Sequence, residues 1–405
     1  MSPADRPARY RHGDRGYRQI TVALFAAGLA TFIGLYSTQA LLPELSAVFA
    51  VGPASAALSV SVTTGALAIF VLPISALSDR FGRRRVMIIS AIGSAAIGLA
   101  LPLAASWPVL LAGRALQGVA LAGVPAVAMA YLAEEVDPSA LGAAMGRYIG
   151  GTTIGGLIGR LTPGLTLDLA DWRVALLAAA VLAGVAAALF AALSPRSAHF
   201  SPAPATPRRI AAGVVRHLRT PALLALYALA FVLMGGFVTV YNYLGYRLLA
   251  PPFSLPPGAV ALIFLLYLAG TVSATWAGRL ADRRGRSRVL AVTVGATLLG
   301  LAITLAPWLP AVLAGTALFT AGFFAAHAVA SGWVGALADR DRGTASGLYL
   351  CGYYAGSSVI GALGGVVFAA GGWPAVVGYV GALCLVAFVL GRVPAGIGRA
   401  GGHRP

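Results

Sequence analysis

Charged side chains gather in two short stretches of an otherwise apolar chain, LSDRFGRRRV at 77–86 and LADRRGRSRV at 280–289. Each stretch places one aspartate beside several arginines, and pairs of carboxylate and guanidinium are strong, specific contacts that a moving protein can exchange. Further acids follow later apolar runs in both halves. The pattern predicts an ionic gate in which these arginines pair with acids that follow the fourth or the tenth apolar run. The candidate gating residues are Asp79, Arg80, Arg83, Glu134 and Glu135 in the first half and Asp282, Arg283, Arg286, Asp339 and Asp341 in the second.

A second group of polar residues lies inside the apolar runs. A charge deep in a membrane costs about 2.5–3.5 kcal/mol, so Arg114 needs either a partner or a function. His327 can titrate near neutral pH, and tyrosine can contact an apolar or cationic ligand. We therefore predict a substrate and proton pathway lined by Tyr36, Gln39, Arg114, Gln117, Tyr241, Asn242, His327 and Tyr353.

Each of these polar residues has a structural alternative. Arg114 could simply bind backbone carbonyls, and a lone histidine or tyrosine in a helix bundle often only packs. All 12 acids can be placed in the tail, the loops or the helix ends, with Glu44 nearest to the pathway. No carboxylate is therefore expected in the middle of a membrane span.

The composition identifies the solvent of this chain as lipid. Of its 405 residues 59% are hydrophobic and 10% are charged, whereas soluble domains carry about 25% charged residues. Twelve apolar runs are each long enough to cross a bilayer. They lie near residues 20–42, 54–78, 86–105, 108–133, 141–162, 174–193, 222–246, 257–280, 288–307, 309–336, 344–370 and 374–391.

The basic residues are distributed as in a multi-pass membrane protein. All 29 are arginines, and most fall in alternate loops and in the two tails. The positive-inside rule makes these loops and both termini cytoplasmic, and we expect the bacterial inner membrane. No arginine cluster is interleaved with stacking aromatic residues, so a nucleic-acid partner is excluded. Cys351 and Cys384 lie inside runs, and no residue pattern calls for a metal or a cofactor.

An internal repeat divides the chain into two halves. The two charged stretches are identical at seven of ten positions, and GAAMGRYIGGTTIGG from Gly142 aligns with GTASGLYLCGYYAGS from Gly343. Repeats of this kind are typical of transporters. We predict a tail at 1–19, a six-helix bundle at 20–193, a linker at 194–221, a second six-helix bundle at 222–391 and a tail at 392–405.

Twelve spans in two parallel repeats, with G-x-L-A-D-R-x-G-R after the second span of each half, resemble the major facilitator superfamily of secondary transporters. The resemblance covers essentially the whole chain, although Ser75 stands where the first copy should begin with glycine. It implies an all-α membrane fold whose two bundles rock about a central site. The charged loops then gate the pathway. The alternative, that their arginines only orient the chain, does not explain an aspartate at the same place in both halves.

Two further motifs are similar to those of proton-coupled antiporters in that superfamily. The sequence R-A-L-Q-G at Arg114 resembles the R-x-x-Q-G motif, whose arginine is associated with proton transfer. The fifth span keeps the glycine register of the antiporter motif, although Gly156 replaces its proline and Arg160 its last glycine. Small residues permit close helix packing whatever the function. The packing glycines are Gly151, Gly155 and Gly159.

These observations together predict a monomeric secondary transporter that exports a small organic molecule in exchange for protons. Uptake of an organic anion recognised by Arg114 is the alternative within the same fold. A channel is disfavoured because no charged ring or filter loop is visible. A membrane enzyme is disfavoured because the spans hold no catalytic arrangement of histidine, serine and acids.

Overall fold

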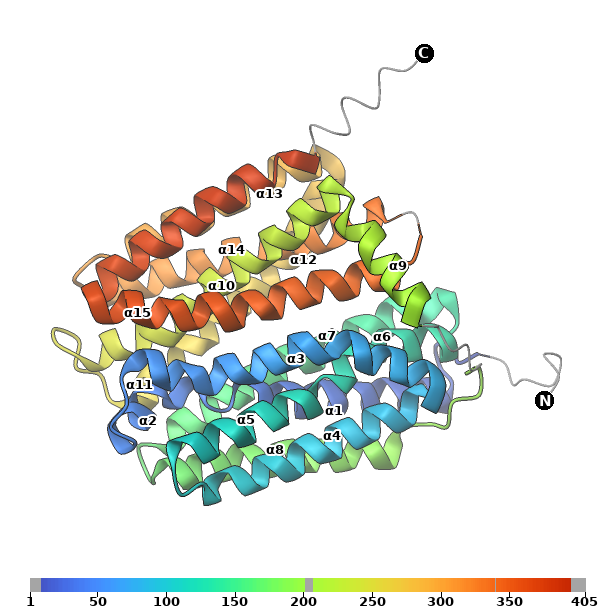
Figure 1. The fold of residues 1–405 in the computed structure, drawn as a ribbon, viewed down its shortest axis with the longest axis horizontal. Helices are drawn as coiled ribbons and strands as arrows, with labels where there is room; N and C mark the ends of the chain where they lie inside the picture. Colours follow the sequence, from blue (N-terminus) through green and yellow to red (C-terminus); the bar gives the residue numbers. More distant parts are fainter. Residues whose placement is uncertain (1–8, 201–206, 339, 395–405) are drawn as a thin grey trace, which may run out of the picture. The chain divides into compact units, whose positions relative to one another are not determined.

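The computed structural model describes residues 9–200, 207–338 and 340–394, and within them it confirms the all-helical membrane fold (Figure 1). Ten helical segments there are long and apolar enough to cross a membrane. One of them, α15 (Arg342–Leu390), contains two helices joined at the non-helical residues Gly371 and Gly372. The helix α7 (Pro138–Thr166) adds a further segment of spanning length, so the described residues account for all twelve predicted spans.

Alanine and leucine dominate the spans of the first half, and both favour helix. Several helices begin at a proline, whose missing N–H costs nothing in the first turn. Asp137 and Asp171 cap α7 and the helix after it through their side chains. The elements of the first half are α1 (Arg15–Tyr36), η2 (Gln39–Leu41), α2 (Leu42–Val48), α3 (Pro53–Phe81), α4 (Arg83–Ala100), η3 (Leu101–Leu103), α5 (Trp107–Leu121), α6 (Gly123–Glu135), α7 and α8 (Trp172–Leu193).

The second half follows the same order of spans after a short linker helix. Here α11, η4 and α12 together form one span, as α5 and α6 do in the first half. The elements are α9 (Pro207–Leu218), α10 (Pro221–Leu249), α11 (Pro257–Ala261), η4 (Leu262–Leu266), α12 (Tyr267–Arg284), α13 (Arg286–Ile303), α14 (Leu309–Leu337) and α15.

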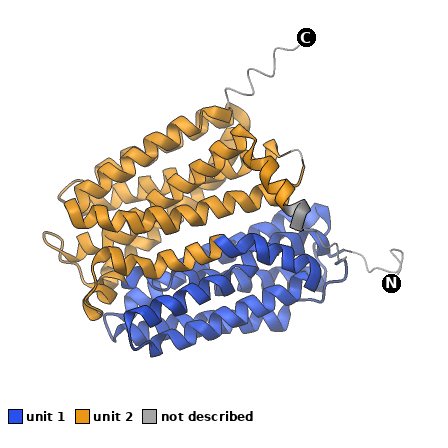
Figure 2. Cartoon of the chain, in the orientation of Figure 1, with its two compact units in different colours: residues 1–41, 69–205 blue, residues 42–68, 206–405 orange. Residues whose placement is uncertain are grey.

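The described helices form two compact units (Figure 2). Unit 1 contains residues 1–41 and 69–205, and unit 2 contains residues 42–68 and 206–405. Unit 2 therefore includes α2 and the first half of α3, which the repeat in the sequence assigns to the first bundle. The division into bundles at the 194–221 linker stays a prediction.

Glycines let the backbones of one helix pair approach closely in each unit. A Cβ atom built at Gly155 would lie 2.7 Å from the Leu29 carbonyl oxygen of α1, and one at Gly159 would lie 2.6 Å from that of Ile33. Gly151 is equally close to Phe25. In unit 2, Gly356 of α15 approaches the Phe231 carbonyl of α10 in the same way. The glycines of the fifth span thus pack α7 on α1, and the repeat reproduces this contact as α15 on α10.

Candidate functional site

Arg83 is the centre of an ionic cluster in unit 1. Its guanidinium lies 2.5 Å from Asp79 Oδ1 and 3.1 Å from Glu134 Oε1, at the ends of α3 and α6. It also donates to Ser78 Oγ at 2.6 Å. The Arg83 side chain is 14% exposed, which strengthens these contacts relative to fully solvated ion pairs. The structure thus brings Asp79, Arg83 and Glu134 together, while Arg80 lies over the Phe81 ring.

Glu135 belongs to a different contact, with the start of the linker. It is fully buried, and its Oε1 accepts from the His199 backbone N–H at 3.0 Å. Its Oε2 lies 3.1 Å from His199 Nδ1. Nearby, Tyr131 donates to the Pro195 carbonyl at 2.7 Å, and Arg84 donates to the Ser194 carbonyl at 2.9 Å. The linker therefore begins firmly attached to the ends of α4 and α6.

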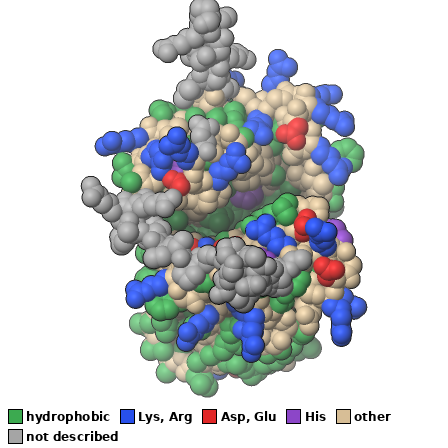
Figure 3. All heavy atoms as spheres, turned by 90° about the vertical axis from the view of Figure 1, so that its right-hand side faces the viewer, with side chains coloured by type: hydrophobic (Ala, Val, Ile, Leu, Met, Phe, Trp, Pro, Cys, Tyr) green, Lys and Arg blue, Asp and Glu red, His purple; other side chains and the backbone are tan. Residues whose placement is uncertain are grey.

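The segment before α1 is attached to the same place. Tyr10 pairs with the backbone on either side of Val136, donating to the Glu135 carbonyl and accepting from the Asp137 N–H, both at 3.0 Å. Burial and the Glu135 carboxylate raise the pKa of Tyr10. Hydrogen bonds from Ser139 hold the pKa of Asp137 below its ordinary value. Figure 3 shows arginine side chains gathered over this end of the helices.

The charged loop of unit 2 is more open than that of unit 1. Arg286 lies 3.9 Å from Asp282, whose side chain is 74% exposed. Asp341 pairs with Arg216 of the linker helix α9 at 2.5 Å. Among the described residues, Arg283 forms no ion pair, and Asp339 lies outside them. The repeat in the sequence is thus not matched by a repeat in the ionic contacts.

Arg114 lies fully buried on α5 and binds the end of α1. Its two terminal nitrogens donate to the Gly34 and Leu35 carbonyl oxygens, each at 2.8 Å. One of them also donates to Gln117 Oε1 at 2.5 Å. The last carbonyls of a helix have no partner within it and carry partial negative charge. The guanidinium therefore satisfies the end of α1, which favours the structural alternative for this residue.

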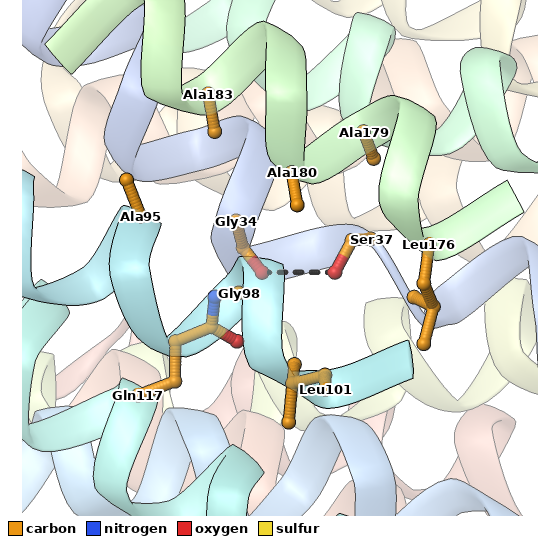
Figure 4. Close-up of a pocket in the computed structure, with 10 residues that line it drawn as sticks. All are labelled: Gly34, Ser37, Ala95, Gly98, Leu101, Gln117, Leu176, Ala179, Ala180 and Ala183. Carbon is orange, nitrogen blue, oxygen red and sulfur yellow. Dashed lines mark hydrogen bonds between the residues drawn. The ribbon is translucent and has the colours of Figure 1, made fainter. Parts of the chain in front are cut away.

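A small cavity lies beside this contact in unit 1 (Figure 4). Its free interior volume is about 10 Å³, on the scale of a single water molecule and far below the volume of sites for drug-sized ligands. Its polar atoms come from Gly34, Ser37 and Gln117, and most of the remaining wall is alanine. The cavity lies among α1, α4, α5 and α8 and has neither the size nor the polar lining of a substrate site.

A second buried arginine, which the motif analysis noted only as a departure from glycine, contacts two residues that the sequence predicts for the pathway. Arg160 of α7 is 2% exposed and donates to Gln39 Oε1 and to the Gly156 carbonyl, both at 2.6 Å. Its guanidinium lies 3.7 Å from the centre of the Tyr36 ring. The sequence signal for this residue is a charged side chain at a position where the motif has glycine. Tyr36 and Gln39 thus meet around a cation.

An aromatic row runs through unit 2 between α10, α12, α14 and α15. Phe237 is stacked on Phe323 with ring centres 3.9 Å apart, and Tyr241 continues the row at 5.0 Å from Phe237. Tyr241 also hydrogen-bonds Thr320 at 2.7 Å. The members of this aromatic row are Phe237, Tyr241, Phe264, Tyr267, Phe319, Phe323, Phe324, His327, Tyr349, Tyr353 and Tyr354.

His327 lies at one end of the aromatic row. Its Nδ1 is 3.0 Å from Tyr349 Oη, and its ring centre is 4.8 Å from that of Tyr353. The same Tyr349 hydroxyl lies 3.4 Å from the His327 carbonyl oxygen. The half-buried imidazole is thus held by a phenol that can either donate to it or accept from it. Asn242, also predicted for the pathway, is buried on α10.

Residues 42–68 pack on the rest of unit 2 at several levels. Tyr246 Oη lies 2.7 Å from Ser46 Oγ and donates to the Leu42 carbonyl at 2.9 Å. Ser358 of α15 donates to the Ser61 carbonyl at 2.7 Å. Gly365 leaves room for Ala54, because a Cβ atom there would collide with it. The first half of α3 therefore lies directly against α15.

This arrangement of helices and charged loops matches a known family. The family profile described as the Major Facilitator Superfamily matches residues 24–271 and 240–399. The inner membrane transport protein YnfM of Escherichia coli (strain K12) is 42% identical over 91% of this chain and 89% of its own. The MFS-type transporter YybF of Bacillus subtilis (strain 168) is 40% identical over 91% and 92%. The chain belongs to the Major Facilitator Superfamily.

Solved structures of other superfamily transporters share this fold. A bacterial homologue of the human lysosomal transporter Spinster, inward-facing and unoccupied, matches with a TM-score of 0.71 at 17% identity and covers 95% of this chain and 96% of its own. The nucleoside transporter NupG matches with a TM-score of 0.74 at 14% identity, over 92% and 99%. The chain is therefore a multi-pass membrane transporter of a small-molecule substrate, and not an enzyme.

Proposed function

We propose that this transporter exports a small organic molecule across the bacterial inner membrane and draws the energy from proton entry. The position of His327 carries the proposal of coupling. Of the 12 acids and 5 histidines, it is the one that the sequence places in the middle of a span. A proton bound there would lie between the two sides of the membrane.

The contact with Tyr349 accommodates both protonation states of His327. When the imidazole is neutral at Nδ1, the phenol donates to it across 3.0 Å. When Nδ1 carries a proton, it donates to the phenol oxygen instead, and the phenol proton turns to the His327 carbonyl at 3.4 Å. The site can therefore load and release a proton without leaving a buried group unsatisfied.

The aromatic row supports a substrate with apolar or aromatic surface. Aromatic rings bind such molecules through stacking and burial, and Tyr353 joins the row to the proposed proton site at a ring distance of 4.8 Å. The name of one relative supports exchange: the MFS antiporter QDR3 of Candida albicans is 29% identical over 37% of this chain. The name of YnfM supports an inner-membrane location.

The ion pairs of Arg83 and the packing of residues 42–68 on α15 support a gating scheme. We infer that the bundles rock about the substrate site, that Arg83 closes one end of the pathway through Asp79 and Glu134, and that residues 42–68 close the other against α15. Both termini then lie in the cytoplasm, as the arginine distribution predicts. The unit of transport in this scheme is a monomer.

Uptake of an organic anion is the second candidate, and Arg160 favours it. A buried guanidinium beside Tyr36 and Gln39 provides positive charge where a carboxylate or phosphate could bind. In this case the anion, rather than a proton on His327, would neutralise the pathway during transport.

The test uses purified protein in vesicles with an imposed pH gradient, screened first over dyes, sugars and amino acids for a transported substrate. We expect His327→Gln to lose uphill transport driven by the gradient and to keep exchange of labelled for unlabelled substrate, which needs no net proton movement. The control is His12→Gln, because His12 precedes the first span. Gradient-driven transport by His327→Gln at the wild-type rate would overturn the proton assignment, whereas a substrate accumulated only from outside would favour uptake.

A further inference from the structure

The linker helix α9 has two faces of different character. Gly213 and His217 are buried against unit 2, and Arg216 pairs with Asp341 at 2.5 Å. On another side of the helix Ala211 is exposed, with Val215 at 45% and Leu218 at 42%. Spacings of four and three residues place these three on one stripe. A helix held on one face thus presents an apolar stripe that the described protein does not cover.

The orientation of α9 fits the surface of a bilayer. Figure 1 shows α9 crossing the direction of α10 and α15 at a steep angle, while both of those helices have the length and composition of membrane spans. A helix transverse to spanning helices lies along the membrane plane. The chain enters α10 only three residues after Leu218, and Leu224 of α10 is 47% exposed where a spanning helix meets lipid. The apolar stripe is therefore followed within a few residues by a helix surface that faces lipid.

The charge of the linker identifies the kind of lipid. Residues 194–221 contain five arginines and no acid. Arg219 is exposed one position beyond the stripe, and Arg216 is exposed close by. Basic amphipathic helices bury their apolar stripe at the boundary of headgroups and acyl chains, and their arginines bind anionic headgroups.

We propose that α9 lies in the interface of the leaflet on the arginine-rich side, which the predicted topology makes cytoplasmic, and binds anionic phospholipid. Val215 and Leu218 enter the acyl boundary, while Arg219 binds headgroup phosphate and Arg216 stays attached to Asp341. The bilayer then covers the exposed stripe and fixes the linker relative to the membrane. This inference depends on membrane insertion but not on the substrate or on proton coupling.

The first experiment measures the depth of α9 in nanodiscs. Cys351 and Cys384 are replaced by alanine, and spin labels are attached to Val215→Cys, Leu218→Cys and the matched control Ala212→Cys, which is exposed on the same helix away from the stripe. We expect labels at 215 and 218 to collide with dissolved oxygen and to be shielded from a water-soluble nickel chelate, with the reverse at 212. Equal access of the chelate to all three would overturn the proposal, and so would shielding of 215 and 218 from both reagents, which indicates a protein cover.

The second experiment tests the headgroup. A fluorophore at Val215→Cys is quenched by brominated phosphatidylglycerol or by brominated phosphatidylcholine at equal fractions in mixed bilayers. We expect stronger quenching by phosphatidylglycerol, and a loss of this preference of about fivefold in Arg219→Gln, from the attraction of one arginine for an anionic surface. Equal quenching by both lipids would overturn the assignment to anionic lipid even if the helix lies at the membrane.

Discussion

The carboxylate of Glu135 binds His199 through both of its oxygens, one at 3.0 Å from the backbone nitrogen and the other at 3.1 Å from ring Nδ1. Glu135 ends the α5–α6 span, and His199 lies in the linker. This acid, which the sequence suggests for the gate, binds the linker in the structure. Of the residues predicted for the gate in the first half, Arg83, Asp79 and Glu134 form an ionic cluster in unit 1.

Removing the Glu135 carboxylate should release the start of the linker. Glu135→Ala leaves the His199 N–H without its acceptor, and an unsatisfied buried donor costs about 1–3 kcal/mol. We expect a lower melting temperature and faster tryptic cleavage after the exposed Arg196, followed by mass spectrometry. Glu44→Ala, far from the linker in the chain, is the control. Unchanged cleavage at Arg196 would show that the other contacts of the linker hold it without Glu135.

The two aspartates of the repeated loops should differ in their effect on transport. Asp79→Asn removes a charge from a half-buried contact, and losing a hydrogen bond between charged groups worth about 1.5–3 kcal/mol should slow turnover by about tenfold or more. Asp282→Asn affects an exposed pair at 3.9 Å, which is worth about 0–1 kcal/mol, so flux should stay within about fivefold. Initial flux per inserted protein measures both. Equal losses of flux in the two variants would indicate that both charged loops contribute equally to gating.

Substitution of Arg114 should change stability more than pH dependence. Its planar fork reaches two carbonyl oxygens and Gln117 at once, and a lysine ammonium lacks that geometry. We expect Arg114→Lys to melt earlier and to transport more slowly, with a flux–pH profile that overlays the wild type. A shifted optimum in Arg114→Lys or Arg114→Ala would instead assign Arg114 to proton transfer, as the R-x-x-Q-G resemblance implies.

Arg160 separates the two candidate substrate classes. Arg160→Gln keeps hydrogen-bonding capacity but removes the charge over the Tyr36 ring, a contact worth about 0.5–2 kcal/mol. For a neutral or cationic substrate we expect a loss of stability with KM nearly unchanged. For an anion, KM should rise about tenfold or more. Comparing KM for both substrate types in vesicles, with melting temperatures beside them, decides between export of an uncharged or cationic molecule and uptake of an anion.

Two glycines on one helix provide a matched test of the α1–α7 contact. Gly155→Ala places a methyl group 2.7 Å from the Leu29 carbonyl, whereas Gly146 has open space around it. We expect Gly155→Ala to lower the melting temperature markedly. Gly146→Ala should be neutral or stabilising by up to about 1 kcal/mol, because alanine favours helix over glycine. A similar response at both positions would mean that α7 can move away from α1 at little cost.

The sequence predicts the fold well because long apolar runs and a repeated loop leave few alternatives in lipid. It predicts that arginines of the charged loop pair with acids at the end of the fourth or tenth span, and the contact between Arg83 and Glu134 is one such pair. It does not predict the partners of Glu135 and Asp341, since both bind linker residues whose positions depend on packing rather than on spacing. In the sequence, Arg160 is recognised only as a departure from the last glycine of the antiporter motif. A motif shows which residues are retained, but it does not show what a substituted side chain contacts.

The two helices of α15 are joined directly at Gly371 and Gly372, with no loop between them. Only these two residues depart from helical geometry over 49, so the two helices are joined by a very short connection. Leu385, Val386 and Val389 on the second half are exposed, where a membrane helix contacts acyl chains. If this half tilts in the proposed cycle, its match to the hydrocarbon changes, and the rate of transport should then depend on bilayer thickness. The energy needed to deform the surrounding lipid would then add to the energy needed to move the protein.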